Sequence, residues 1–446
     1  MKKTRTLAIG AFTAVAALSL AACSSSGSGG DDKTGGASDQ KTIGTVDGSG
    51  KTLTVWAMSG DYTDETLKAI NDKFKADTGA DVKVETQQWA DIGTKLTTAL
   101  ATTTPPDVID IGNTQVSTYA ATGGLADLSK YKDALQQGGT WLGSLVDPST
   151  VDGKLYAVPS FAGNRAVIYN KKTWADAGVT EAPTTYADLK SDLDKIKAKN
   201  TASDFSAFYL PGQYWYAGLS WTFDTGSKIA TQQDGKWAAD FSDKGVKGLD
   251  EYKAFQNAYS SKASQTLNSG GENNPDQTQL FADGKTATII GALWDPASIV
   301  KAAGKKLTLD DLGTFALPSP SGDGMAYNFG GGEVWGVAQK SQNQDLALAW
   351  LKVATSEDIQ LKLAAQPWIP NTNELAAQAA TNAAPINSGF FAGASKTFST
   401  PNATKWATVE ANKVMENLFS SVASGSKSSA DAAKTADDAI NSTLNG

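Results

Sequence analysis

The segment LTVWAM at residues 53–58 sets the expectation for the fold, together with the amphipathic stretch that follows it up to Gly79. The first segment is rich in β-branched and aromatic residues, which favour strands. In the second, Leu67, Ile70 and Phe74 recur at helical spacing, and Gly79 is a typical helix terminator. The pair therefore predicts a strand followed by a helix.

The same order repeats along the chain. Strands that alternate with helices form crossover units, so the pattern predicts an α/β fold with a largely parallel sheet and ligand sites at the carboxyl ends of its strands. Further strands are expected at 81–85, 107–111, 155–158, 166–169, 205–209, 286–290, 314–316 and 334–337, and helices at 91–102, 116–121, 171–177, 185–199, 213–223, 244–259, 343–365, 403–423 and 428–444.

Length and composition exclude several classes of protein. The chain has 446 residues, which at about 150 per domain allows two or three domains. Histidine is absent, which excludes a Ser-His-Asp triad and His-ligated zinc or iron. The formal net charge of −8, without a Lys/Arg block, argues against a nucleic-acid partner. We expect no catalytic residue, no metal and no cofactor.

The N-terminus has the pattern of a secretory signal. Positive residues precede an uncharged apolar run at 7–20, and small residues follow it. The tetrad LAAC at 20–23 resembles the bacterial lipobox, in which the cysteine is lipidated after cleavage. We therefore expect residues 1–22 to be a signal peptide and Cys23 to carry a lipid that anchors the protein at the extracytoplasmic face of the cell membrane.

A polar segment separates Cys23 from the predicted folded body. Residues 23–50 consist largely of Ser, Gly, Thr, Asp and Lys, with few apolar side chains to offset the entropy of ordering. They are expected to form a flexible tether, with the folded body starting near Lys51.

Aromatic residues gather where strand ends and loops are predicted. A flat ring covers the apolar C–H face of a pyranose, and planar polar side chains pair with the neighbouring hydroxyls. Carbohydrate is the ligand that this composition favours. The aromatic residues in such positions are Trp56, Tyr62, Trp89, Tyr214, Trp215, Tyr216, Trp221, Trp294, Trp335, Trp368 and Trp406.

An enzymatic alternative would need paired carboxylates of the glycosidase kind. None of the available carboxylates stands in a recognisable motif, and a surface-anchored glycoside hydrolase therefore remains the weaker hypothesis. The candidates are Asp61, Glu85, Asp110, Glu272, Asp295 and Glu333.

Four stretches resemble the extracellular solute-binding proteins of carbohydrate ABC transporters, the family of the maltose/maltodextrin-binding protein. They occur in the order and with roughly the spacing of that family. The stretches are PDVIDIGNTQ at 106–115, DGKLYAVP at 152–159, FADGKTA at 281–287 and GGEVWGV at 331–337.

The resemblance implies a periplasmic-binding-protein-like fold, in which two α/β lobes are joined by a hinge and close on a ligand in the cleft between them. It places the first lobe at 51–162 plus 327–369 and the second at 163–326 plus 370–446. It also implies that the protein acts as a monomer that delivers its ligand to the permease subunits of an ABC importer, and that it is not an enzyme.

The family's sugar contacts can be carried over by position. They come from the loop after the first strand, from the turn after the third, and from loops of the second lobe. The expected ligand-binding residues are Asp61, Trp89, Asn113, Thr114, Gln115, Asn164, Arg165, Gln213, Trp215, Trp294, Asp295, Glu333 and Trp406.

The sequence departs from the maltodextrin pattern. The stretch 161–165 lacks the acidic residue found there, and Asn-Thr-Gln at 113–115 replaces a charged loop, so maltose itself is not expected. These segments look more like members from high-GC Gram-positive bacteria, some of which take up chito-oligosaccharides or plant oligosaccharides. A polyol or glycerol phosphate is the alternative ligand, although Arg165 is the only arginine in the mapped cleft.

Overall fold

Residues 40–446, apart from 91, 271–273 and 323, are described in the computed structural model, and they form one compact unit. The predicted signal peptide, Cys23 and most of the predicted tether lie outside the described residues. No helix in the described part of the chain combines the length and the apolar character that a membrane span requires.

The packed chain starts earlier than the sequence predicted. Ile43 and Val46 pack against the hydrophobic core, and the backbone N–H of Gly48 donates to the carbonyl of Thr78 over 2.7 Å. Residues 43–48, which were predicted to belong to the flexible tether, therefore pack against the folded body. Two apolar side chains in a polar stretch are enough to hold this segment against the body.

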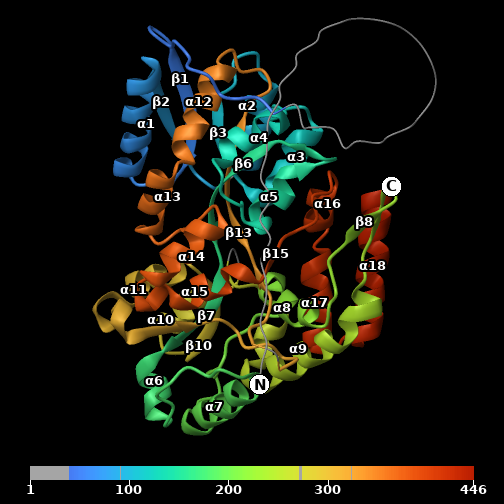
Figure 1. The fold of residues 1–446 in the computed structure, drawn as a ribbon. Coiled ribbons are helices and arrows are strands. Elements are labelled where there is room, and N and C mark those ends of the chain that lie inside the picture. The colour runs from blue at the N-terminus through green and yellow to red at the C-terminus, as the bar shows by residue number, and fades with distance from the viewer. Residues whose placement is uncertain (1–39, 91, 271–273, 323) are drawn as a thin grey trace, which may run out of the picture. The chain divides into compact units, whose positions relative to one another are not determined.

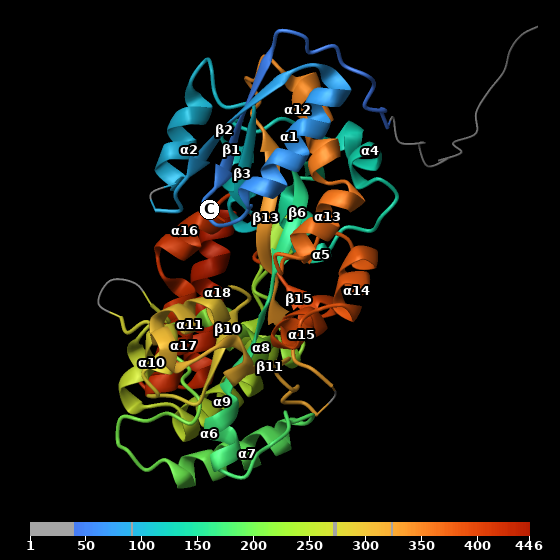
Figure 2. The same cartoon turned by 90° about the vertical axis from the view of Figure 1, so that its left-hand side faces the viewer.

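Six strands form the larger sheet (Figures 1 and 2). In spatial order they are β14 (Ile369–Pro370), β6 (Ala157–Gly163), β13 (Gly331–Val337), β3 (Val108–Gly112), β1 (Thr52–Met58) and β2 (Asp81–Gln87). β1 pairs in parallel with β2 and β3, as predicted. The expectation of a largely parallel sheet is wrong for the rest, because β13 is antiparallel to β3 and β6, and β14 to β6. The chain leaves the larger sheet at the end of β6 and re-enters it through β13. β6 and β13 therefore run in opposite directions.

Helix α1 (Asp64–Thr78) shows how the sequence specifies the local structure. The Thr63 side chain accepts from the N–H of Thr66 at the N-cap, and Gly79 ends the helix with a left-handed φ of 75°. Its buried face includes Ile70 and Phe74, as the periodicity predicted. α1 packs beside α12 (Gln344–Ala354) in Figure 2. The single helix expected over 343–365 is instead α12 and α13 (Glu357–Ala364), because Ser356 between them is extended.

The second sheet has three antiparallel strands in the order β10 (Thr288–Ala292), β7 (Arg165–Asn170), β11 (Leu312–Phe315). Neighbouring residues of a strand point to opposite faces. Accordingly, Ile168 and Ile289 belong to the hydrophobic core that continues into the larger sheet, whereas Val167 and Ile290 belong to a second core. The three-stranded sheet thus separates two cores.

Helices α8 (Trp215–Asp224), α9 (Val246–Tyr259), α17 (Val414–Ser424) and α18 (Ser429–Asn445) pack together around the second core. The helix expected over 403–423 is split into α16 (Trp406–Ala411) and α17, because Lys413 adopts a left-handed φ of 53°. The strand expected at 205–209 is reduced to isolated bridges at Ser206 and Tyr209.

The remaining α-helices and β-strands of the described chain range from a 14-residue helix to two-residue strands. They are α2 (Ile92–Ala101), α3 (Val116–Ala121), α4 (Lys132–Gln136), α5 (Gly143–Ser149), α6 (Lys171–Asp176), α7 (Tyr186–Lys199), α10 (Gln277–Ala282), α11 (Asp295–Ala303), α14 (Asn373–Thr381), α15 (Ser388–Ala392), β4 (Thr150–Val151), β5 (Lys154–Leu155), β8 (Thr231–Gln233), β9 (Lys236–Ala238), β12 (Asn328–Phe329) and β15 (Thr397–Phe398). The chain passes from the larger sheet to the smaller one between Gly163 and Arg165. The predicted lobe boundaries stay a prediction.

Candidate functional site

A cavity of about 710 Å³ lies where the ends of the two sheets meet. Arg165 begins β7 and pairs in register with Ala292 at the end of β10. Thr114 and Gln115 reach the cavity from the turn that follows β3 of the larger sheet. Among the described residues, the lining consists of Thr114, Gln115, Arg165, Tyr214, Trp215, Tyr216, Asn268, Ser269, Gly270, Asp276, Gln277, Thr278, Ala292, Trp294, Asp295, Ser298, Glu410 and Glu416.

The most exposed aromatic ring at the cavity belongs to Trp294, which is 50% exposed. Its ring lies 6.3 Å from that of Trp368, and a Cβ on Gly163 would come within 3.1 Å of it, so a larger residue at 163 would crowd the ring. Trp368 donates its indole N–H to the Asp61 carbonyl over 2.9 Å and stacks on Phe161. The sequence analysis did not assign Trp368 to the site, and its only signal was an aromatic residue at a strand start.

Arg165 is surrounded by aromatic rings. Its guanidinium carbon lies 4.6 Å from the Tyr216 ring centre and 4.7 Å from that of Phe329. Its Nε donates to the Tyr214 hydroxyl over 2.8 Å. Cation–π contact and this hydrogen bond fix the plane of the guanidinium group. The cationic side chain at this wall of the cavity is therefore held by uncharged partners.

Carboxyl groups line the same cavity. Asp295, the first residue of α11, accepts from the N–H of Ala292 over 2.9 Å, and burial raises its pKa to about 6. Burial also raises the pKa of Glu410 to about 7 and the pKa of Glu416 above its usual range. The two glutamates come from α16 and α17, and sequence reasoning missed both because the fold brings them to the cavity from far along the chain.

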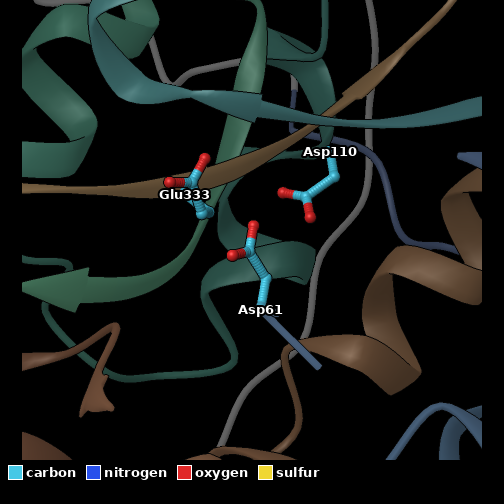
Figure 3. Close-up of side chains that lie close together, drawn as sticks. All are labelled: Asp61, Asp110 and Glu333. Carbon is cyan, nitrogen blue, oxygen red and sulfur yellow. The ribbon is translucent and has the colours of Figure 1, made fainter. Parts of the chain in front are cut away.

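A second group of carboxyls lies at the end of the larger sheet. Asp61 follows β1, Asp110 is in β3 and Glu333 is in β13, and Figure 3 shows their side chains pointing toward one another. One oxygen of each lies within 4.8 Å of the others. Each also has a buried oxygen with no hydrogen-bond partner, whereas the other Asp110 oxygen accepts from the N–H of Met58 over 3.1 Å. We call these three residues the carboxyl triad.

Three negative charges on the carboxyl triad would repel one another strongly. At 4.8 Å and an effective dielectric constant of about 20, each like-charged pair costs about 3.5 kcal/mol. Burial raises the pKa of Asp61 to about 7, and burial together with neighbouring carboxylates raises the pKa values of Asp110 and Glu333 well above their usual range. Three converging carboxylates could hold a divalent cation, although calcium takes six to eight oxygens. With no cation bound, the raised pKa values favour protonation of the carboxyl triad.

The structure brings together six of the residues that the sequence analysis assigned to the ligand, and it places the others elsewhere. The six that line the cavity are Thr114, Gln115, Arg165, Trp215, Trp294 and Asp295. Asp61 and Glu333 belong to the carboxyl triad. Trp89 is 39% exposed and Gln213 is half-buried, and neither lines the cavity.

The remaining three assigned residues are buried. The amide of Asn113 donates to the carbonyl of Ser144 over 2.8 Å, and that of Asn164 donates to Phe390 over 3.2 Å. Trp406 has no exposed surface and packs in the second core. A ring in this position is not available for stacking on a sugar, because hydrophobic burial against α8 and α17 holds it in the core.

Comparisons with known proteins identify the family of the chain. Residues 59–361 match the family described as bacterial extracellular solute-binding proteins. The Diacetylchitobiose binding protein DasA of Streptomyces coelicolor is 39% identical over 96% of both chains. The Maltodextrin-binding protein MdxE of Bacillus subtilis is 25% identical over 82% of this chain and 78% of its own.

Solved structures share the fold. The cyclic α-maltosyl-1,6-maltose binding protein from Arthrobacter globiformis superposes with a TM-score of 0.72 at 23% identity, covering 89% of this chain and 99% of its own. The predicted two-lobe α/β fold is thereby confirmed. This chain belongs to the family of bacterial extracellular solute-binding proteins.

Proposed function

We propose that this protein captures a di- or oligosaccharide in the cavity and delivers it to the permease of an ABC importer. The observation that carries the proposal is the half-exposed Trp294 ring, which lies beside a cavity of about 710 Å³ lined by amide, carboxyl and guanidinium groups. A ring of this kind suits the apolar face of a pyranose, and the polar groups suit its hydroxyls.

The sugar that we propose first is an N-acetylated disaccharide of the diacetylchitobiose type. Support comes from the 39% identity to a diacetylchitobiose-binding protein over 96% of both chains. The departures from the maltodextrin pattern in the turn that contains Thr114 and Gln115 point the same way.

Capture would work by hinge closure. Residues from the ends of both sheets line the cavity, so a ligand that touches both stabilises the closed arrangement and shifts the equilibrium toward it. Lipidation of Cys23 would keep the protein, as a monomer, at the extracytoplasmic face of a Gram-positive cell membrane, where the permease can bind the closed form.

The alternatives are less well supported. A glycerol phosphate would have to approach Glu410, Glu416 and Asp295, and Arg165 is already engaged by Tyr214 and by aromatic rings. A hydrolase would turn its ligand over, whereas the family consists of binding proteins. Intact disaccharide recovered after prolonged incubation would exclude hydrolysis directly.

A thermal-shift screen of the purified protein tests the proposal. Diacetylchitobiose, cellobiose, maltose, glycerol 3-phosphate and a polyol are compared at equal concentration. A ligand present at a thousand times its dissociation constant adds about 4.1 kcal/mol to stability, which is a shift of several degrees. We expect the largest shift with diacetylchitobiose. A shift only with the polyol or the phosphate, from folded protein, would replace the sugar proposal.

A further inference from the structure

Gln277, the first residue of α10, forms part of the cavity wall and is assigned to the ligand neither by the sequence analysis nor by the comparisons. Its side chain is 4% exposed. Buried polar side chains generally have hydrogen-bond partners. For Gln277, these partners can be identified atom by atom.

The orientation of the Gln277 amide is determined by its neighbours. Nε2 donates to the carbonyl of Ile290 over 3.1 Å and to Oδ2 of Asp295 over 3.4 Å. A backbone carbonyl can only accept, so the amide nitrogen must face Ile290 and the amide cannot be flipped. Oε1 is therefore the atom left over, and it is buried with no donor among the described residues.

Other unpartnered atoms at the cavity have the same polarity. Gln115 and Glu416 also line the cavity, and Oε1 of Gln115 and Oε2 of Glu416 are buried without a hydrogen-bond partner. Among the described residues of the lining, each buried side-chain atom without a partner is an oxygen acceptor. A ligand group that only donates satisfies Oε1 of Gln277 fully, whereas a hydroxyl also brings lone pairs toward this oxygen. An amide N–H is a group that only donates.

We propose that Gln277 is a specificity-determining residue whose Oε1 accepts a hydrogen bond from the acetamido N–H of the bound sugar. This inference rests on the proposed function and adds the group by which the protein distinguishes an N-acetylated sugar from its hydroxyl analogue. A site built to accept a ligand hydrogen bond disfavours an analogue that leaves the acceptor unpaired.

Isothermal titration calorimetry of the full protein provides the test, with diacetylchitobiose and cellobiose as probes. Gln277→Met keeps the length of the side chain and removes the acceptor. Gln279→Met is the matched control, because Gln279 is exposed on the same helix and bonds to Asp283 instead. We expect Gln277→Met to lower the affinity for diacetylchitobiose by about tenfold and that for cellobiose by less than about threefold, and Gln279→Met to change neither.

Two outcomes would overturn the inference separately from the function. If Gln277→Met weakens both sugars equally, or neither, the residue does not read the acetamido group although the protein still binds sugar. If the unmodified protein binds neither probe, the proposed function fails as well.

If Gln277→Met unfolds, or if cellobiose binds too weakly to titrate, a crystal structure of the unmodified protein with diacetylchitobiose tests the proposal instead. We expect an acetamido nitrogen at about 2.7–3.2 Å from Oε1 of Gln277. A complex that places a ligand hydroxyl or a water there would contradict the proposal.

Discussion

The surroundings of the carboxyl triad and of the half-buried Arg165 accommodate charged side chains in opposite ways. The Arg165 guanidinium packs against the neighbouring Tyr216 and Phe329 rings, and its Nε donates to the Tyr214 hydroxyl. In the carboxyl triad, the oxygens converge within 4.8 Å, and no Lys or Arg of the described residues is among the groups that shift their pKa values.

The two groups differ in whether their polar atoms are satisfied in the protein without a ligand. The arginine has uncharged partners of complementary polarity, so its position is determined without ligand. The carboxyl triad has unsatisfied acceptors on each member, and it is relieved only by protons, a cation or ligand donors. A neutral side chain in the carboxyl triad should therefore raise the free energy of unfolding, whereas a neutral side chain at Arg165 should lower it.

The largest expected effect is the loss of sugar affinity when the aromatic ring at the cavity is removed. Trp294→Ala removes the half-exposed ring and should weaken binding of diacetylchitobiose by at least about 2 kcal/mol, the size of a hot-spot contact. Calorimetric titration measures the change. Leu309→Ala is the control, because Leu309 is a large apolar residue that is 44% exposed and does not line the cavity. Equal affinities for the two variants would remove Trp294 from the site.

A second prediction concerns the pH dependence of stability. The raised pKa of Glu333 means that the folded protein holds its proton at a pH where the unfolded chain has lost it. The free energy of unfolding is then greatest below the ordinary pKa of about 4.5 and falls as pH rises through the raised value. Glu333→Gln stays neutral, so it should unfold at higher urea concentration than the native chain at pH 8.

The expected gain for Glu333→Gln at pH 8 exceeds about 1.4 kcal/mol, the equivalent of one pKa unit, and shrinks toward pH 4. Urea denaturation at both pH values measures it. Glu65→Gln, at an exposed glutamate in the first turn of α1, controls for the loss of one carboxylate. A lower stability of Glu333→Gln at pH 8 would show that a cation, and not protons, balances the carboxyl triad.

The smallest expected effect is at the arginine. Arg165→Lys keeps the charge but loses the planar group and the Nε bond to Tyr214, and it should lower the free energy of unfolding by about 1 kcal/mol. Urea denaturation with Lys172→Ala as control, at an exposed i,i+4 ion pair, measures the difference. No loss in Arg165→Lys would mean that charge alone matters there, which would remove the contrast with the carboxyl triad.

Much of the fold was predictable from local pattern. The strand at residues 53–58, the helix that follows it and its end at Gly79 follow from side-chain periodicity and capping, which act over a few residues. The direction of β13 was not predictable, because it depends on a chain that leaves the larger sheet at Gly163 and returns at Gly331.

The candidate site was predictable in part. Arg165, Trp294 and Asp295 were predicted because the family's sugar contacts, carried over by position, fall on them, and they line the cavity. Trp406 matched the same reasoning but is wholly buried. Gln277 carried no motif, and its role as a cavity acceptor depends on the carbonyl of Ile290 in a different element.

By itself, the sequence determined the α/β class, the absence of histidine chemistry and the family, because these depend on composition, local periodicity and motif order. Only the tertiary structure decided which aromatic rings face the cavity, which amide oxygens lack a donor, and that three carboxyls more than 270 residues apart at their extremes converge within 4.8 Å. Those properties depend on distances between segments that are remote in the chain, and a linear pattern does not contain such distances.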